Sequence, residues 1–210
     1  GTVFYRKRLS KKEIINVSKQ FVEKSSFRGV ARVTGHHLDT IRNLASDVAQ
    51  HCEAVNNFLL QDVKLGTHEI DEFWSFVKKK QKNVECKYTK DYEQGDAYSY
   101  LDIKRETDLF TAFVVGKWIQ ETCNELYELI SQRTQQPTYY QKINFCTDCN
   151  KQNENGILEN FNKDCVNYGQ VVKDKIDQII YGTHRRKVIG NLDYSKISIA
   201  HIDGFCSALR

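Results

Sequence analysis

The stretch that most constrains this chain is residues 67–77, which are acidic at the start and aromatic and apolar in the second half. They include no Gly or Pro and are enriched in β-branched and aromatic residues, so they are predicted to form a buried strand. A carboxylate buried in a sheet is costly unless it is paired or binds a metal, so Asp71 is expected to face a cation. The alternative is that Glu69, Asp71 and Glu72 are solvated positions on an edge strand.

The composition is that of a globular protein. With 210 residues, 40% of them hydrophobic, the chain can form one sizeable domain and a small accessory one. No apolar run reaches about 18 residues and no signal peptide opens the sequence, so no membrane partner is expected. Seven cysteines without an export signal are expected to be reduced thiols in the cytoplasm. Because the sequence starts at Gly1 and has no Met, we expect a piece of a longer reading frame.

Positive charge is concentrated in the first part of the chain. Residues 1–66 carry 11 Lys and Arg against 6 Asp and Glu, whereas residues 67–210 carry 20 against 21. This asymmetry suggests that the front segment binds a polyanion, although ordinary surface charge would also explain it. A basic arm formed by Arg6, Lys7 and Arg8 is expected to lie along phosphates.

The front segment also predicts a helix-turn-helix. A first helix is expected after Ser10, which forms a capping-box pattern with Glu13. In residues 27–46, Ala31 permits close helix contact, Gly35 permits the turn, and Ile41 packs the second helix back. The alternative is any pair of packed helices joined by a glycine turn. The side chains expected to face a major groove are His37, Asp39, Thr40, Arg42 and Asn43.

The loop at residues 65–66 is the expected domain boundary, which divides the chain into residues 1–66 and 67–210. In the second part, strands at 97–104 and 109–115 are predicted to form a meander with residues 67–77. A helix is expected after Gly116, and a fourth strand at 138–147 would end at Asp148. The expected class is α/β (α+β), with a mixed sheet. This order is that of a ribonuclease-H-like domain, in which strands one and four are neighbours, so Asp71 and Asp148 would meet.

Further basic residues are candidate contacts to a nucleic-acid backbone. Lys78 and Lys79 open a charged segment at 78–96, and Arg185 and Arg186 belong to a second basic run at 184–187.

Three other segments complete the second part. Cys146 and Cys149 form a Cys-x-x-Cys pair, but a zinc site would need a second pair, so we interpret them as small buried residues at a strand end. Residues 166–181 fit either a strand or a helix. Asp203 lies in a final helix that is expected to be truncated at the end of the sequence.

Together these segments resemble the transposases of the insertion-sequence-one family. Residues 69–74 and 147–148 resemble the segments that hold its first two catalytic acids. Where the family has a Glu in a Glu-Arg-x-Asn run, this chain has Asp203 followed by Gly, Phe and Cys. The remaining segments that carry the resemblance are 28–35 with 40–41 for the helix-turn-helix, and 168–173, 190–193 and 197–198 for the approach to the third acid.

The resemblance implies metal-dependent DNA cleavage and strand transfer at insertion-sequence ends. Asp71, Asp148 and Asp203 would be the catalytic residues and would hold two Mg²⁺ (or Mn²⁺) ions, with Asp71 bridging both. The implied partners are double-stranded DNA, as element terminal repeats and target, and a second copy of the chain in a homodimer or larger assembly. The implied location is the prokaryotic cytoplasm, at the nucleoid.

Two alternatives follow from the same residues. A decayed or repurposed transposase would bind DNA through residues 27–46 without cutting, and the departure at Asp203 favours this possibility. A nuclease for RNA–DNA hybrids is disfavoured, because a helix-turn-helix has no role in recognising a hybrid.

Overall fold

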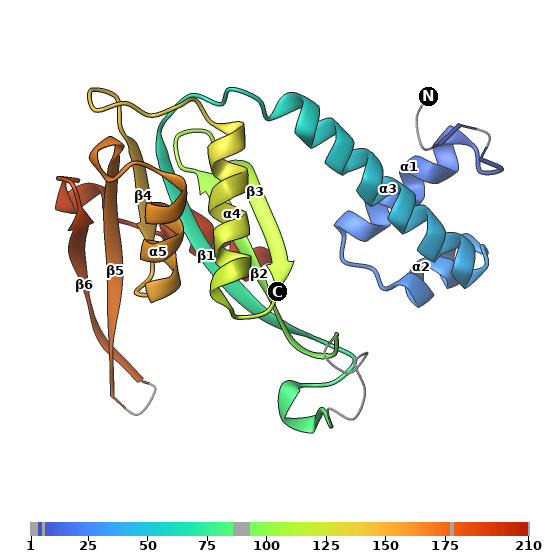
Figure 1. Cartoon of the computed structure of the whole chain (residues 1–210). Coiled ribbons are helices and arrows are strands. Elements are labelled where there is room, and N and C mark those ends of the chain that lie inside the picture. Colours follow the sequence, from blue (N-terminus) through green and yellow to red (C-terminus); the bar gives the residue numbers. More distant parts are fainter. Residues whose placement is uncertain (1–3, 6, 86–92, 177–178, 210) are drawn as a thin grey trace. The chain divides into compact units, whose positions relative to one another are not determined.

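The computed structural model describes residues 4–5, 7–85, 93–176 and 179–209, so Arg6 of the expected basic arm lies outside the described part (Figure 1). The chain divides into two compact units, Gly1–Leu60 and Gln61–Arg210. Within the described ranges no helix combines the length and apolarity needed to cross a membrane.

The first unit consists of three helices: α1 (Lys11–Val22), α2 (Phe27–Thr34) and α3 (Leu38–Leu59). The predicted capping box at Ser10 and Glu13 is confirmed, with both reciprocal hydrogen bonds present. Gly35 ends α2 at a φ of 73°, a left-handed conformation that glycine adopts without steric cost. Val17, Val30, Ile41 and Leu44 form the buried core between the helices.

The second unit contains a six-stranded mixed sheet with the order β3-β2-β1-β4-β5-β6. The parallel pairs are β1–β4 and β4–β5, and the other neighbours are antiparallel. The unit is therefore mixed α/β, and the predicted meander of the first three strands is confirmed. The strands are β1 (Thr67–Val77), β2 (Gly95–Lys104), β3 (Leu109–Gly116), β4 (Ile143–Thr147), β5 (Val166–Ile176) and β6 (Ile179–Ile189).

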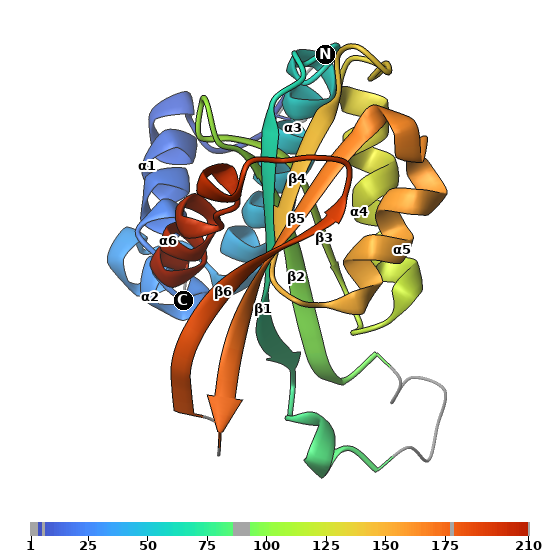
Figure 2. The ribbon, with the colours of Figure 1, turned by 90° about the vertical axis from the view of Figure 1, so that its left-hand side faces the viewer.

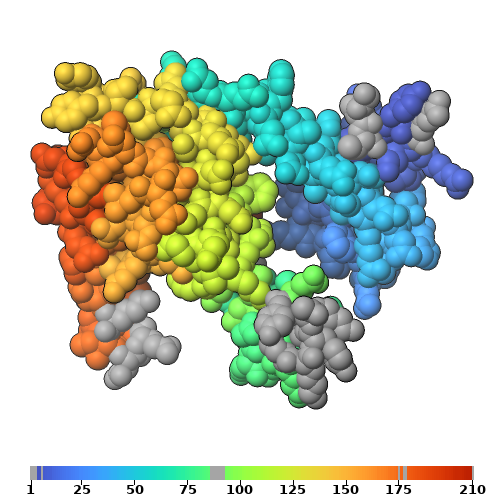
Figure 3. Space-filling model, viewed as in Figure 1, coloured from blue at the N-terminus to red at the C-terminus, as the bar shows by residue number. Residues whose placement is uncertain are grey.

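Helices cover both faces of this sheet. Helices α4 (Gln120–Arg133) and α5 (Lys151–Asn160) lie on one face, and α6 (Ala200–Leu209) lies on the other (Figure 2). The space-filling view shows α4 and α5 covering the front of the strands (Figure 3). Tyr100, Tyr127, Phe145 and Tyr168 are the largest fully buried side chains of the core under α4 and α5. Ile197 and Ile202 belong to a second core on the α6 side.

The fourth strand is shorter than predicted. It begins at Ile143 and not at 138, because Tyr139 and Tyr140 lie in an exposed turn where only short-range hydrogen bonds form. The ambiguous segment 166–181 is a strand as far as Ile176, paired with β4 on one side and β6 on the other. Cys146 and Cys149 are both free thiols. Cys146 is buried as expected, but Cys149 is exposed, because the chain has already left the strand there.

Two helical glycines differ in the space around them, which gives a matched test of the packing. A Cβ on Gly156 would lie 2.4 Å from the ring of Tyr127, whereas a Cβ on Gly204 would meet nothing within 4 Å. The ring of Tyr127 is fully buried, and its hydroxyl donates to Asn153, so it has little room to move.

We expect Gly156→Ala to destabilise the second unit by about 1–3 kcal/mol, as overpacked cores do. Gly204→Ala should stabilise it by up to about 1 kcal/mol, the difference in helix propensity between the two residues. Urea unfolding followed by tryptophan fluorescence measures both, because Trp74 and Trp118 lie in this unit. A Gly156→Ala protein as stable as the parent would contradict the close packing of α5 on α4.

Candidate active site

Asp71 and Asp148 lie on neighbouring parallel strands. In the pairing of β1 with β4, Ile70 is the partner of Thr147, so the next residue of each segment is one of the two acids. Neighbouring strands are about 5 Å apart, and both segments run in the same direction. The prediction that the first and fourth strands are neighbours is therefore confirmed. The edge-strand alternative is wrong, because β1 pairs with β2 on one side and β4 on the other.

Helix α6 brings Asp203 to the same region, and a buried carboxylate holds the start of this helix. Glu69 Oε2 accepts hydrogen bonds from the backbone N–H groups of His201 (2.9 Å) and Ile202 (3.2 Å). Its other oxygen accepts from Nε of Arg105 at 2.6 Å. The remaining guanidinium nitrogens of Arg105 donate to the carbonyls of Lys196 and Ser198, both at 2.7 Å. Glu69 and Arg105 together therefore fix the segment that leads into α6.

The three acids interact electrostatically. The pKa of Asp71 is raised to about 6, mainly because the carboxyl is removed from water, with further contributions from the charges of Asp203 and Asp148. The charge of Lys173 acts in the opposite direction and lowers the pKa of Asp71. Lys173 Nζ lies 3.9 Å from Asp203 Oδ2. Lys173 of β5 is therefore within electrostatic reach of Asp71, and the metal ion expected beside Asp71 stays a prediction.

A fourth carboxylate, Glu72, lies on the other face of the sheet. Alternation along β1 directs it toward Asn150, whose side-chain nitrogen donates to Glu72 Oε1 at 2.8 Å. The pKa of Glu72 is raised to about 8, mainly by burial, with a contribution from the charge of Asp148 and against the lowering effect of this hydrogen bond. Glu72 Oε2 is buried without a hydrogen-bond partner among the described residues. The charge of Asp148, at the end of β4, therefore raises the pKa values of carboxyls on both faces of the sheet, Asp71 and Glu72.

A cavity of about 550 Å³ opens beside Asp203 on the α6 side. It is lined by Lys173 from β5 and by His184 and Arg185 from β6. Arg185, one of the residues predicted to contact a nucleic-acid backbone, therefore lies beside Asp203. Arg186 is the next residue along the strand and has a different environment. Its side chain donates to Gln170, with Cys149 Sγ 3.7 Å away.

The other predicted contacts with a nucleic-acid backbone lie elsewhere. Lys78 and Lys79 follow the end of β1 and are exposed. Lys7 in the first unit forms an ion pair of 2.5 Å with Asp47, whereas Arg8 is exposed. The five residues predicted to face a major groove, His37, Asp39, Thr40, Arg42 and Asn43, are all exposed at the start of α3.

Sequence reasoning missed three residues of this site. Glu69 enters the sequence-based prediction only as a solvated position in the edge-strand alternative, whereas the partner that explains its burial is Arg105, which is 36 residues away. Lys173 lies in residues 166–181, whose sequence fits either a strand or a helix. Glu72 was assigned no role of its own, although period-two alternation already places it opposite Asp71.

In the described part of the chain, no three His, Cys, Asp or Glu side chains are grouped closely enough to hold a metal ion. The acids are therefore within electrostatic reach of one another but are not a closed ligand set. Neither a comparison with protein-family models nor one with curated proteins finds a match for this chain.

The raised pKa of Asp71 predicts how stability depends on pH. A carboxyl whose folded-state pKa is raised binds more protons in the folded state, so its contribution is favourable at low pH and is lost as pH rises from about 4 to about 6. At about 1.4 kcal/mol per pKa unit, the shift corresponds to roughly 3 kcal/mol.

In the presence of a chelator, Asp71→Asn should therefore be more stable than the parent at pH 7 by up to about 3 kcal/mol, with a smaller difference at pH 4. Urea unfolding at both pH values, followed by tryptophan fluorescence, measures this. Asp164→Asn is the matched control, because Asp164 is exposed in the same unit. Equal effects of the two substitutions on the free energy of unfolding at pH 7 would show that the ionised carboxylate of Asp71 does not destabilise the fold.

Proposed function

We propose that the second unit is the ribonuclease-H-like catalytic domain of a DNA transposase, which cuts and joins strands at insertion-sequence ends. The observation that carries this proposal is the convergence of Asp71, Asp148 and Asp203 from β1, the end of β4 and α6. The strand order β3-β2-β1-β4-β5, antiparallel as far as β1 and parallel beyond it, supports the proposed fold. The resemblance of the segments around the three acids to those of the insertion-sequence-one family supports the proposed chemistry.

The donor chemistry of the cluster fits a hard divalent cation. Carboxylate oxygens are the ligands that Mg²⁺ prefers, and the raised pKa of Asp71 reflects negative charge that is only partly compensated. Asp71, Asp148 and Asp203 are the residues that would hold the ions. When bound, two Mg²⁺ or Mn²⁺ ions would activate the attacking water or 3′-hydroxyl and stabilise the leaving oxygen.

Residues around the acids have positioning roles in this proposal. Glu69 and Arg105 hold the start of α6 and therefore the height of Asp203 above the sheet. Lys173 reduces the repulsion between Asp203 and Asp71. Arg185, on the rim of the adjoining cavity, offers a cation to a phosphate that enters it.

The alternative function is DNA binding without cleavage, and one observation favours it. Asp203 occupies the place of the family's Glu, and its carboxylate is already paired with Lys173. Asp is one methylene shorter than Glu, so its carboxylate reaches roughly 1.5 Å less far. A misplacement of about 1 Å at a reacting centre can cost on the order of 100-fold in rate.

We therefore expect weak nicking of terminal-repeat DNA in Mg²⁺, which Asp203→Glu should increase by about 10- to 100-fold. Asp71→Asn should abolish nicking and retain DNA binding. Single-turnover nicking of a pre-bound duplex in Mg²⁺ and in Mn²⁺ measures this, with Asp164→Asn as the control.

Three outcomes would change the assignment. Equal rates for the parent and Asp203→Ala would remove Asp203 from the catalytic set. An Asp203→Glu protein slower than the parent would mean that the site is tuned to the shorter acid. Binding without nicking by every variant would support the alternative function.

The first unit supplies the DNA-binding half of the proposal. Helix α2, the turn at Gly35 and the start of α3 have the order of a helix-turn-helix, and the residues on the outward side of α3 are polar and exposed. His37 caps α3 by accepting from the backbone N–H of Asp39. Arg42 lies 3.2 Å from Asp39, an exposed pair that is weak enough to exchange for a base or phosphate.

Arg42→Ala or Asn43→Ala should reduce discrimination between element ends and random DNA by about 1–3 kcal/mol, the value of one base-edge contact. Binding should also weaken steeply with salt, because Lys and Arg contacts to phosphates release counterions. Anisotropy titrations on both DNAs at two salt concentrations measure these effects. Asn16→Ala, exposed on α1, is the control. An equal loss on both DNAs would show that α3 only positions the protein.

A further inference from the structure

A second cavity, of about 580 Å³, opens at the end of β4 and contains an unusual combination of side chains. Asp148 and Lys173 line it from the acid cluster, Lys151 lines it from the start of α5, and Trp118 lines it from the segment before α4. Its volume is within the range of about 300–1,000 Å³ that holds small ligands. The cavity therefore brings an aromatic surface and two cations to the proposed reaction centre.

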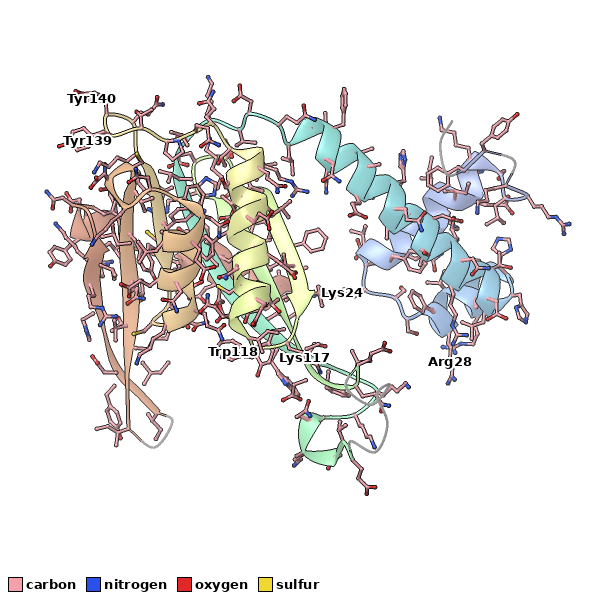
Figure 4. The ribbon with its side chains drawn as sticks, in the orientation of Figure 1. Lys24, Arg28, Lys117, Trp118, Tyr139 and Tyr140 are labelled. Carbon is pink, nitrogen blue, oxygen red and sulfur yellow. The ribbon has the colours of Figure 1, made fainter. Side chains whose placement is uncertain are left out.

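Trp118 is exposed but held in place. The residue is 44% exposed, and its ring packs against Tyr98, with centroids 4.7 Å apart, and against Tyr100, at 6.1 Å. The preceding residue, Lys117, donates to the carbonyls of Gln94 (2.7 Å) and Asp96 (2.8 Å). Both residues lie below the first turn of α4 in Figure 4. A large apolar ring kept in solvent on a rigid support is organised for stacking and not for the core.

The side chains that line the cavity indicate the chemical class of ligand that it would bind. A planar, uncharged ring stacks on an indole, and a phosphate attracts Lys151 and Lys173. A nucleotide joins a flat ring to a phosphate and therefore matches both features of the cavity. Asp148 would repel the phosphate of a free nucleotide, but in the proposed function it is one of the residues that would hold a cation, and that cation would attract the phosphate.

We propose that Trp118 is a stacking platform for an unpaired base of the DNA strand whose backbone enters the acid cluster at Asp148. The inference rests on the proposed function, because it takes its substrate from there. A base inside a duplex is already stacked on both faces, so only a frayed, flipped or overhanging nucleotide can present its face to Trp118. The cavity then sets which nucleotide beside the reacting phosphate is left unpaired.

The test compares binding of three DNAs in Ca²⁺, a hard divalent cation that carboxylates bind: a paired duplex, the same duplex with unpaired nucleotides at its end, and the latter with abasic sites in place of the unpaired bases. Trp118→Ala should weaken binding of the unpaired-end DNA by about 5- to 150-fold, the range for one base–aromatic stack. Binding of the other two DNAs should be unchanged, and Trp118→Phe should retain most of the affinity. Trp74→Ala is the matched control, because Trp74 is similarly exposed, at 41%, on β1.

A second measurement does not depend on the folding of Trp118→Ala. In a Trp74→Phe protein Trp118 is the sole tryptophan, and its fluorescence should be quenched by the unpaired-end DNA and not by its abasic counterpart. Equal quenching by both DNAs, or an equal loss of binding to all three with Trp118→Ala, would overturn the proposal. Saturable quenching by a free mononucleotide with no preference for DNA would overturn it in favour of a nucleotide pocket.

The outcomes separate this inference from the proposed function. Metal-dependent nicking with base-independent binding would overturn the role of Trp118 alone. Base-dependent binding through Trp118 without nicking would support the platform and overturn the proposed cleavage. A chain that binds none of the DNAs would overturn both.

Discussion

The arrangement of the candidate site depends on one buried carboxylate, Glu69. It is fully buried in β1, a location that would be costly for a charge without partners. Its charge is compensated by the guanidinium of Arg105, by two backbone N–H groups at the start of α6 and by the positive end of that helix. Because Arg105 also binds the chain before α6, a single charge pair joins the sheet to the helix that carries Asp203.

The alternation of β1 then distributes charge over the two faces of the sheet. Glu69 and Asp71 face α6, whereas Glu72 faces the layer of α4 and α5 and bonds to Asn150. Asp148 follows the adjacent strand and raises the pKa values of both Asp71 and Glu72. A cluster assembled in this way has more negative charge than Lys173 alone balances, which is the physical reason to expect a cation or a cationic partner here.

The two units have different chemistry. The first is a small, basic three-helix unit with polar residues exposed on α3, and the second contains the acid cluster and both tryptophans. In the proposed function, the first unit contributes sequence recognition and phosphate attraction, whereas the second contributes the acids and a surface for an unpaired base. Lys173 and Trp118 are central to the second role, since each lines the cavity beside Asp148.

Local patterns in the sequence determined much of this architecture. The β-branched and aromatic content of residues 67–77, the Ser10–Glu13 capping box and Gly35 each specify local geometry, and the strand, the cap and the turn all form. The prediction that the whole strand is buried is wrong, because its aromatic second half is exposed. The pairing of strands one and four, and with it the meeting of Asp71 and Asp148, followed from the order of elements along the chain. Only the tertiary structure decided the partners of Glu69 and the position of Lys173, because those contacts join residues that are 30 to more than 100 positions apart. Local propensity has no information about such contacts, and the burial that makes them strong exists only once the sheet and α6 have packed together.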